Sequence, residues 1–336
     1  MQPQVVSPMP TGSGAIVVHR MLERLLDNFR VIPYSPRLTY FPPALKWCVP
    51  RPDADILHTT PDHAPMFRRR GVPLVVTFHN FVVDAFMSQY STLVQRIHYA
   101  TDSRYFLRRS LEIADRVTAV SAFTADLIRT ELSYTGRIEV ISNGVDTDTF
   151  RPSGSTRNTS KPRVLFAGNP SLRKGAHWLP EMARRLNARA TIVCTVAGRS
   201  PWAKRLTSAG VEITEKVPFA AMPDLYRSVD ALLLPTVREG DSLAVLEAMS
   251  SGLPVVASDC SSLPERVAPG RGGYLCEIGD VDGFVAAIDK LADPQLRASM
   301  GNFNRARAEA EFSLSAMARR YRRIFSELAT RRSCRR

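Results

Sequence analysis

The hydrophobic positions of this chain fall into short runs rich in Val, Ile and Leu, which alternate with segments of helical periodicity. Such runs are typical of parallel strands buried on both faces, and the segments between them are typical of crossover helices. In the first half, the pattern predicts strands at 29–32, 55–58, 73–77, 116–120 and 137–141 and helices at 15–26, 99–114 and 122–132. Ser121 directly precedes the last helix and is predicted to cap it.

A polar segment at 151–162 interrupts this pattern with Pro, Gly, Ser and Thr and is predicted to be a linker. After it, strands are predicted at 163–167, 190–197, 212–217, 231–235 and 254–257, and helices at 178–186, 223–228, 243–250 and 282–291. The chain is therefore predicted to be α/β, with two doubly wound, Rossmann-like domains at 1–150 and 163–311 that face each other across a cleft.

The end of the chain has a different pattern, with apolar residues at helical spacing among many arginines. The apolar set is Leu314, Met317, Tyr321, Ile324, Phe325 and Leu328. An amphipathic helix is predicted over 312–330, packed back on the first domain. The alternative is a basic helix that lies on an anionic bilayer.

Composition limits the class of protein only broadly. The 336 residues carry a formal net charge of +13, which favours anionic partners without choosing among lipid, nucleic acid and phosphorylated substrates. No apolar run approaches the roughly 18 residues of a membrane span, and the N-terminus lacks the pattern of a secretory signal. Five scattered cysteines indicate reduced thiols, so a cytoplasmic location is expected.

Two glutamates near the predicted helix 243–250 are candidate ligand-binding groups. Glu239 precedes the helix and Glu247 lies within it. The positive end of a helix favours phosphate, while carboxylates accept hydrogen bonds from hydroxyls, so the combination suits a phosphorylated, polyhydroxylated ligand. Gly12 and Gly14 precede the first helix and would let backbone N–H groups approach a phosphate, although a tight turn without a ligand explains them equally well.

A histidine and a basic turn add two further candidates. His79 follows the predicted strand 73–77, and His58 closes the strand 55–58 as a weaker candidate. Side chains at the carboxyl ends of parallel strands point toward bound ligands. Arg173 and Lys174 stand in the first strand–helix turn of the second domain, where two cations and a helix start favour phosphate.

Taken in order, four motifs resemble a family 4 glycosyltransferase. They are VISNGVDTDTFRP, the RKG turn, MPDLYRSVDALLLPTVREG and EGDSLAVLEAMSSGLPVVASDCSSLPE. The resemblance covers nearly the whole chain and is strongest from Arg137 to Glu265. It implies the GT-B fold and transfer of a sugar, with retention of configuration, from a nucleotide diphosphate sugar. Asp53–Asp55 and Asp146–Asp148 match the D-x-D string of metal-dependent enzymes, but they are better explained as turn residues.

The resemblance also implies roles for individual residues. Lys174 would neutralise the donor diphosphate, Glu239 would hold sugar hydroxyls beside the reacting carbon, and Glu247 would bind the ribose hydroxyls. His79 would lie near the transferred sugar as a catalytic-site residue with Glu239. Gly12 and Gly14 would lie beneath the diphosphate, which would be stabilised without a metal or other cofactor.

The chain departs from the family pattern at two places in the implied donor site. Asn169 stands where relatives have Arg, and Arg173 is the expected substitute cation. Asp241 and Ser242 stand where Phe-Gly is usual. Ser242, just before Leu243, is expected to cap the helix, and Asp241 to face the sugar or Arg238.

The expected function is therefore sugar transfer to a lipid-linked or polysaccharide acceptor, at or near an anionic membrane surface. A sugar-nucleotide 2-epimerase and a catalytically silent nucleotide-sugar-binding scaffold are the alternatives. A nucleic-acid partner is not expected, because charge alone supports it and no recognised module is present.

Overall fold

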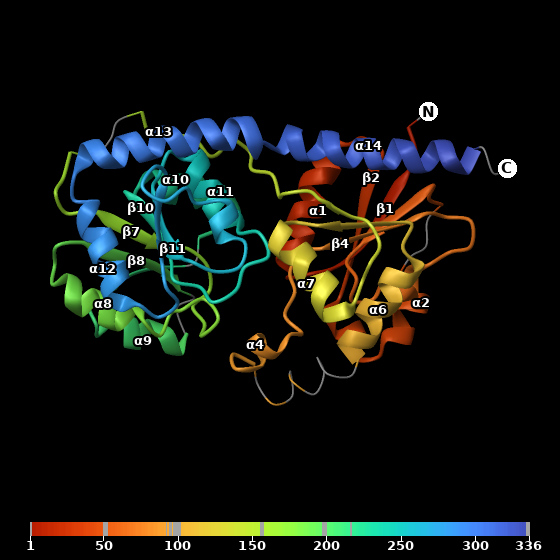
Figure 1. Ribbon diagram of the computed structural model, residues 1–336, viewed down its shortest axis with the longest axis horizontal. Helices are drawn as coiled ribbons and strands as arrows, with labels where there is room; N and C mark the ends of the chain where they lie inside the picture. Colours follow the sequence, from red (N-terminus) through yellow and green to blue (C-terminus); the bar gives the residue numbers. More distant parts are fainter. Residues whose placement is uncertain are drawn as a thin grey trace. The chain divides into compact units, whose positions relative to one another are not determined.

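A computed structural model describes residues 2–49, 53–91, 93, 96, 102–154, 158–196, 200–215 and 217–333. The chain forms two compact units (Figure 1). The first unit comprises Met1–Asn143 and Leu314–Arg336, and the second comprises Gly144–Ser313. Each unit is built on a parallel six-stranded sheet, so the prediction of two Rossmann-like α/β units is confirmed.

The first unit has the strand order β2-β1-β3-β4-β5-β6. Its strands are β1 (Val5–Pro10), β2 (Phe29–Tyr34), β3 (Ile56–Thr59), β4 (Leu74–Phe78), β5 (Arg116–Ala119) and β6 (Ile138–Val140). Its helices are α1 (Gly14–Leu25), α2 (Leu45–Cys48), α3 (Ala64–Phe67), α4 (Ala85–Ser88), α6 (Arg104–Ile113), α7 (Ala122–Leu132) and α14 (Leu314–Ser333). Helix α14 therefore belongs to the unit formed by the first part of the chain, where it contacts α1 and β3.

The two faces of this first sheet differ in polarity, because successive side chains of a strand point to opposite sides. One face forms an apolar core with α6 and α7 and includes Val6, Leu57, Val76 and Val117. The other face carries the buried polar residues Ser7, His58, Thr77 and Thr118. Side chains of α1 and α14 contact this polar face, which therefore meets protein rather than water.

The second unit has the order β12-β11-β10-β7-β8-β9, the usual arrangement of a dinucleotide-binding sheet. Its strands are β7 (Arg163–Phe166), β8 (Thr191–Val196), β9 (Glu212–Glu215), β10 (Ala231–Leu234), β11 (Val255–Ser258) and β12 (Gly273–Cys276). Its helices are α8 (Leu179–Leu186), α9 (Pro201–Thr207), α10 (Met222–Arg227), α11 (Leu243–Ser250), α12 (Val281–Lys290) and α13 (Pro294–Glu311).

Both faces of the second sheet are apolar. Val164 and Phe166 of β7 pack into one core with residues of α8 and α12, while Leu165 packs into another with residues of α10 and α11. Strands β8 and β9 are added on one side of β7, and strands β10 to β12 on the other, so the strand order switches between β7 and β10. Ligands of such sheets bind at this switch point, beyond the carboxyl ends of the strands. A ligand-binding site is therefore expected at the turns that follow β7 and β10.

Several details differ from the prediction. The division between units falls at Asn143–Gly144, and the segment 151–162 lies within the second unit. The strands β1 and β12 and the helices α9 and α13 were not predicted, because their apolar residues are too few or too short in extent to show a clear period. The first residues of the predicted helix 99–114 lie outside the described part of the chain, and α6 is described from Arg104.

Two predictions of local chemistry are confirmed. The Ser121 hydroxyl accepts a hydrogen bond from the Thr124 amide and caps α7. Asp146 acts as a turn residue, since its Oδ1 accepts from the amides of Asp148 and Thr149. Among the described helices, none combines the length and apolar character needed to cross a membrane.

Candidate functional site

A glycine allows the basic turn after β7 to lie directly against the end of β10. Gly175 has φ +75°, and a Cβ there would lie 1.8 Å from the carbonyl oxygen of Pro235. The turn and the strand end can approach this closely only because no side chain separates them. Val237 N also donates to the Arg173 carbonyl oxygen at 2.9 Å. The fold thereby places Arg173 and Lys174 beside the segment that follows β10.

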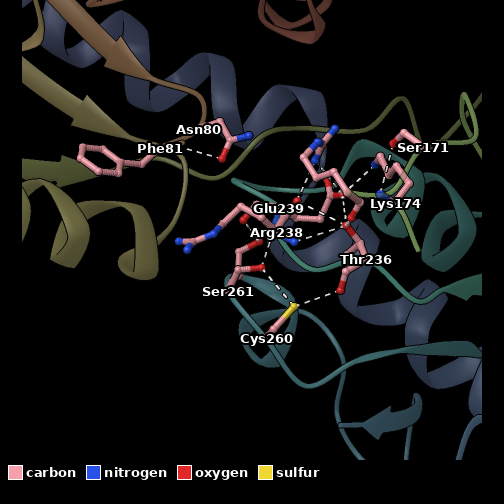
Figure 2. A network of polar contacts seen from close by, with 11 residues as sticks. Asn80, Phe81, Ser171, Lys174, Thr236, Arg238, Glu239, Cys260 and Ser261 are labelled. Carbon is pink, nitrogen blue, oxygen red and sulfur yellow. Dashed lines mark hydrogen bonds and ion pairs between the residues drawn. The ribbon is translucent and has the colours of Figure 1, made fainter. Parts of the chain in front are cut away.

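Glu239 lies in that segment and binds both cations through one carboxylate oxygen. Lys174 Nζ donates to Glu239 Oε1 at 2.7 Å, and Arg173 Nη1 lies 3.5 Å from the same oxygen. Thr236 Oγ1 lies 3.0 Å from it, and Figure 2 shows Lys174, Thr236 and Glu239 converging. Within the described residues, Glu239 Oε2 has no hydrogen-bond partner.

The two cations keep Glu239 ionised although it is 7% exposed. Burial raises the pKa of the carboxyl, but the charges of Lys174 and Arg173 and the hydrogen bonds from Lys174 and Thr236 outweigh this effect. The net pKa is below its ordinary value. The group is therefore a hydrogen-bond acceptor at neutral pH and not an acid.

The backbone around Glu239 is fixed by the turn after β11. Glu239 N donates to Ser261 Oγ at 3.0 Å, and Ser262 Oγ donates to the Glu239 carbonyl oxygen at 3.3 Å. Cys260 Sγ contacts the Thr236 carbonyl oxygen, and burial raises the pKa of its thiol to about 11 (Figure 2). Cys260 is therefore a protonated packing group rather than a reactive thiolate.

Asp241 forms a buried ion pair with Arg266, a cation that the motifs do not include. Its Oδ1 accepts from Arg266 Nε at 2.8 Å, and the two side chains are 0% and 4% exposed. The expectation that Asp241 faces a sugar or Arg238 stays a prediction, and the ion pair with Arg266 is a further contact that was not expected. Arg266 was not identified from the sequence, because it stands 25 residues beyond Asp241 and belongs to no motif.

Ser242 occupies the N-cap position of α11 with extended backbone angles, but its side chain makes no capping hydrogen bond. The expectation that its hydroxyl caps the helix is therefore wrong. Ser242 and Asp241 are both buried, and Leu243 is the first residue of the helix. The start of α11 is held by the ion pair of the preceding residue rather than by a side-chain cap.

Glu247 lies on α11 and contacts a tyrosine. Tyr226 Oη, from α10, donates to Glu247 Oε2 at 2.8 Å. Burial raises the pKa of the Glu247 carboxyl to about 7, although the Tyr226 hydrogen bond lowers it. In the described part of the chain, Glu247 Oε1 has no hydrogen-bond partner, so the group presents one unpaired oxygen.

The remaining predicted residue of this unit, Asn169, is exposed and makes no hydrogen bond among the described residues. It follows Gly168, whose φ is +110°. The structure thus brings Arg173, Lys174 and Glu239 together, places Glu247 on the helix that follows them, and leaves Asn169 apart from their network.

Gly12, Gly14 and His79 belong to the first unit. Gly12 has φ +80°, and Ser13 caps α1 by accepting from Ile16 N at 3.3 Å. A Cβ at Gly12 or Gly14 would meet no atom within 4 Å, so space around both is open. Open space at a helix start is compatible with an anion, but it is also found in an ordinary turn.

His79 follows β4 and contacts a second histidine. Its Nε2 lies 3.1 Å from His19 Nε2, and the His19 ring stacks on His58 with centroids 4.3 Å apart. Burial lowers the pKa of His79 to about 4 and that of His58 to about 3. His58 is wholly buried and bonds Thr77, so it is a core residue of this face rather than an open ligand group.

Taken together, the second unit offers two fixed cations, an ionised carboxylate and a second buried carboxylate at the switch point of its sheet. Cations suit a diphosphate, and carboxylate oxygens without protein partners suit hydroxyl groups. Tyr226, Thr236, Ser261 and Arg266 support this arrangement. Tyr226, Ser261 and Arg266 were not identified from the sequence because each acts through a partner 21 to 25 residues away. Thr236 stands only three residues before Glu239, so its hydroxyl was a local signal that was not used.

Comparisons with known proteins agree with this chemistry. A Glycosyltransferase Family 4 model matches residues 1–149, and a Glycosyl transferases group 1 model matches residues 161–293. A GDP-mannose-dependent alpha-(1-6)-phosphatidylinositol monomannoside mannosyltransferase of Mycolicibacterium smegmatis is 30% identical over 59% of this chain. An MMP alpha-(1->4)-mannosyltransferase of Mycolicibacterium hassiacum is 27% identical over 74% of it. The matches span 59% and 64% of these relatives.

Solved structures show the same fold. Sucrose-phosphate synthase from Thermosynechococcus elongatus superposes with a TM-score of 0.82 at 20% identity, covering 97% of this chain and 99% of that one. Anabaena HepE in complex with UDP superposes with a TM-score of 0.74 at 16% identity, covering 96% and 100%.

Proposed function

Because this chain belongs to the group 1 glycosyltransferases of GT-B fold, we propose that it transfers a sugar from a nucleotide diphosphate sugar to an acceptor hydroxyl. The acceptor class that we propose is a lipid-linked sugar or a growing polysaccharide. The configuration at the sugar carbon would be retained, as the family resemblance implies.

The observation that carries this proposal is that Glu239 and Glu247 each use one carboxylate oxygen for a protein contact and leave the other oxygen available. Oε1 of Glu239 is held by Lys174 and Thr236, and Oε2 of Glu247 by Tyr226. The other oxygen of each carboxylate has no partner in the described residues, so each group is fixed and still able to accept hydrogen bonds. Glu239 would accept from the sugar and Glu247 from the ribose.

The cations complete the donor site. Lys174 and Arg173 share one carboxylate, so their pair carries excess positive charge for a diphosphate. When the bond to the sugar breaks, negative charge grows on the departing diphosphate, and fixed cations stabilise it. The names of relatives and structural neighbours include GDP-mannose and UDP, which supports a nucleotide donor but leaves its base open.

We propose that these side chains replace a metal ion in stabilising the diphosphate. Transfer is then expected to continue in the presence of EDTA, with a rate within about twofold of the untreated enzyme. Activity that disappears with EDTA and returns with Mg²⁺ or Mn²⁺ would contradict this part of the proposal.

An exposed aromatic cluster supports attachment to a membrane surface. Tyr40, Phe41 and Trp47 are 89%, 60% and 76% exposed. They lie on or between the short helices η1 (Pro36–Tyr40), η2 (Pro42–Ala44) and α2, and the neighbouring Arg37 and Lys46 are exposed as well. Aromatic side chains and cations together suit the interface of an anionic bilayer. We propose that this aromatic cluster brings the enzyme to a lipid-linked acceptor.

Vesicle sedimentation tests the aromatic cluster. The protein is expected to bind vesicles containing anionic lipid, and Trp47→Ala should reduce the bound fraction severalfold. Phe219→Ala is the matched control, because Phe219 is also an exposed aromatic residue, at 49%, but lies in the second unit. Equal loss in both variants, or no binding by the unaltered protein, would contradict attachment through this cluster.

The donor proposal is tested by thermal stabilisation with a panel of nucleotide diphosphate sugars, followed by a transfer assay. A ligand at 100 times its Kd adds about 2.7 kcal/mol to the stability of the protein. Arg173→Ala and Lys174→Ala should each weaken donor binding by about tenfold or more. Arg184→Ala is the control, because Arg184 is a 71% exposed arginine of the same unit. No shift with any nucleotide sugar would overturn the proposal.

A further inference from the structure

Ser7, His19 and His79 form a chain of hydrogen bonds inside the first unit. Ser7 Oγ of β1 lies 2.7 Å from His19 Nδ1 of α1, and His19 Nε2 lies 3.1 Å from His79 Nε2. Ser7 and His19 are both 0% exposed. The chain of hydrogen bonds therefore runs from the sheet, through a helix, to the histidine at the carboxyl end of β4.

Both imidazole rings are neutral at pH 7. Burial lowers the pKa of His79 to about 4, and burial together with the neighbouring His58 and His79 lowers that of His19 well below its ordinary value. A hydrogen bond between two neutral rings contains one proton. One of the two Nε2 atoms therefore carries hydrogen, and the other accepts.

This restriction leaves two arrangements of protons. In the first, Ser7 donates to His19 Nδ1, His19 Nε2–H donates to His79, and His79 carries its own proton on Nδ1. In the second, His79 Nε2–H donates to His19, and His19 Nδ1–H donates to Ser7. The Ser7 hydroxyl then needs another acceptor, and within the described chain it has no contact besides His19.

The two arrangements differ in how many buried groups lack a partner. His79 Nδ1 is buried and has no hydrogen-bond partner among the described residues, whichever arrangement holds. The second arrangement adds an unsatisfied Ser7 hydroxyl, which would bear the desolvation penalty of a buried donor. The first arrangement is therefore the more stable, and it leaves His79 with a single unused N–H group.

We propose that Ser7 and His19 are positioning residues that hold His79 in its neutral Nδ1–H form, so that this N–H donates to an oxygen of the bound sugar substrate. The identity of that ligand rests on the proposed function, whereas the proton arrangement does not. His79 then acts as a hydrogen-bond donor that orients the sugar. It does not remove a proton from the acceptor, because Nδ1, the nitrogen that has no protein partner among the described residues, is already protonated.

Nuclear magnetic resonance of the full-length protein tests the proton arrangement without any substrate. Long-range ¹H–¹⁵N spectra of histidine-labelled protein distinguish protonated from bare ring nitrogens, and loss of signals in His79→Asn and His19→Gln assigns each ring. At pH 7 we expect His79 to carry hydrogen on Nδ1 and His19 on Nε2. A proton on Nε2 of His79, or on both of its nitrogens, would overturn the proposal.

The role of Ser7 is tested in the same spectra. Ser7→Ala removes the donor to His19 Nδ1, so the two arrangements become closer in energy and the His79 signals should shift toward a mixture. Ser110→Ala is the matched control, because Ser110 is another buried serine of this unit and its hydroxyl donates to the Pro61 carbonyl oxygen. An unchanged His79 spectrum in Ser7→Ala would show that Ser7 does not set the proton position.

A pair of substitutions tests the contact with the ligand. The amide nitrogen of Asn reaches about where Nδ1 lies, and that of Gln about where Nε2 lies. His79→Asn should keep kcat within about tenfold of the parent, whereas His79→Gln should lower it by about 10²-fold, because loss of the orienting donor leaves the sugar misplaced. Equal losses would overturn the donor role. Absence of transfer in the unaltered protein would instead contradict the proposed function, and the spectra would still decide the proton arrangement.

Discussion

Two buried glutamates of the second unit differ in ionisation because only one of them lies beside cations. Glu239 and Glu247 are both carboxyls that are 7% exposed. Glu239 has two cations and a low pKa, whereas Glu247 has only a tyrosine hydroxyl and a pKa of about 7. The first is a permanent anion, and the second changes charge near neutral pH. Donor binding should therefore depend on pH through Glu247.

Donor affinity is expected to rise with pH up to about pH 7. Ribose hydroxyls would donate to the ionised carboxylate of Glu247, so below its pKa binding must first release a proton, and affinity falls by up to about tenfold per pH unit. Glu247→Gln should bind more weakly at pH 8 and show little pH dependence. Calorimetric titration between pH 5.5 and 8 measures this. A parallel pH profile in the variant would show that another group is responsible.

The buried pair of Asp241 and Arg266 should matter for stability at the residue scale. Asp241→Asn removes the buried carboxylate that lies 2.8 Å from the Arg266 guanidinium, while the more exposed Glu265 lies 3.6 Å from it, and should cost roughly 3–5 kcal/mol. The control is Asp224→Asn, which removes the ion-pair partner of Arg227. The Asp224 side chain is 78% exposed, so this change should alter stability by less than about 1 kcal/mol. Denaturant unfolding compares them. If Asp241→Asn is as mild as the control, the ion pair does not hold the start of α11.

At the scale of elements, the site depends on the close approach of two turns and one strand end. The turn after β7 reaches the end of β10 only because Gly175 lacks a side chain. The sequence placed the RKG turn and the Glu239 segment correctly relative to their strands. It did not show that the two meet, because Lys174 and Glu239 are 65 residues apart and local periodicity carries no information about such pairs.

Gly175→Ala is expected to damage the site more than an ordinary glycine substitution does. Gly210 also has a left-handed φ, of +84°, but nothing lies near its Cβ position. Gly210→Ala should therefore cost about 1–2 kcal/mol from backbone conformation alone. Gly175→Ala adds a clash with backbone and should cost about 1–3 kcal/mol more, with weaker donor binding. Equal effects on melting and on affinity would contradict the close-approach argument.

On the scale of the whole molecule, the two units are expected to respond to pH in opposite directions. The first unit buries three histidines as neutral rings, and the second buries Glu247 with a raised pKa. A histidine that resists protonation when folded destabilises the fold as acid is added. A carboxyl that resists ionisation destabilises the fold as base is added.

The first unit should lose stability as the pH falls from about 6.5 toward about 4. In this range His58 and His79 bind protons in the unfolded chain but stay neutral in the folded protein. Between pH 4.5 and about 7, the second unit should lose stability as the pH rises, because folding holds the proton on Glu247. Calorimetry from pH 4.5 to 8 should show the two transitions moving apart, and Glu247→Gln should remove only the second slope. Two transitions that shift together would refute this.

What the sequence determined by itself is local. Local sequence predicted the described strands except β1 and β12, the longer described helices except α13, the cap at Ser121 and the turn at Asp146, because each depends on neighbours within a few residues. Motif resemblance then indicated the family. Tertiary structure alone decided that Asp241 meets Arg266, that Glu247 meets Tyr226 and that His19 meets His79. Those contacts join segments that only sheet order and packing bring together, and burial at these contacts sets the charge that each group carries.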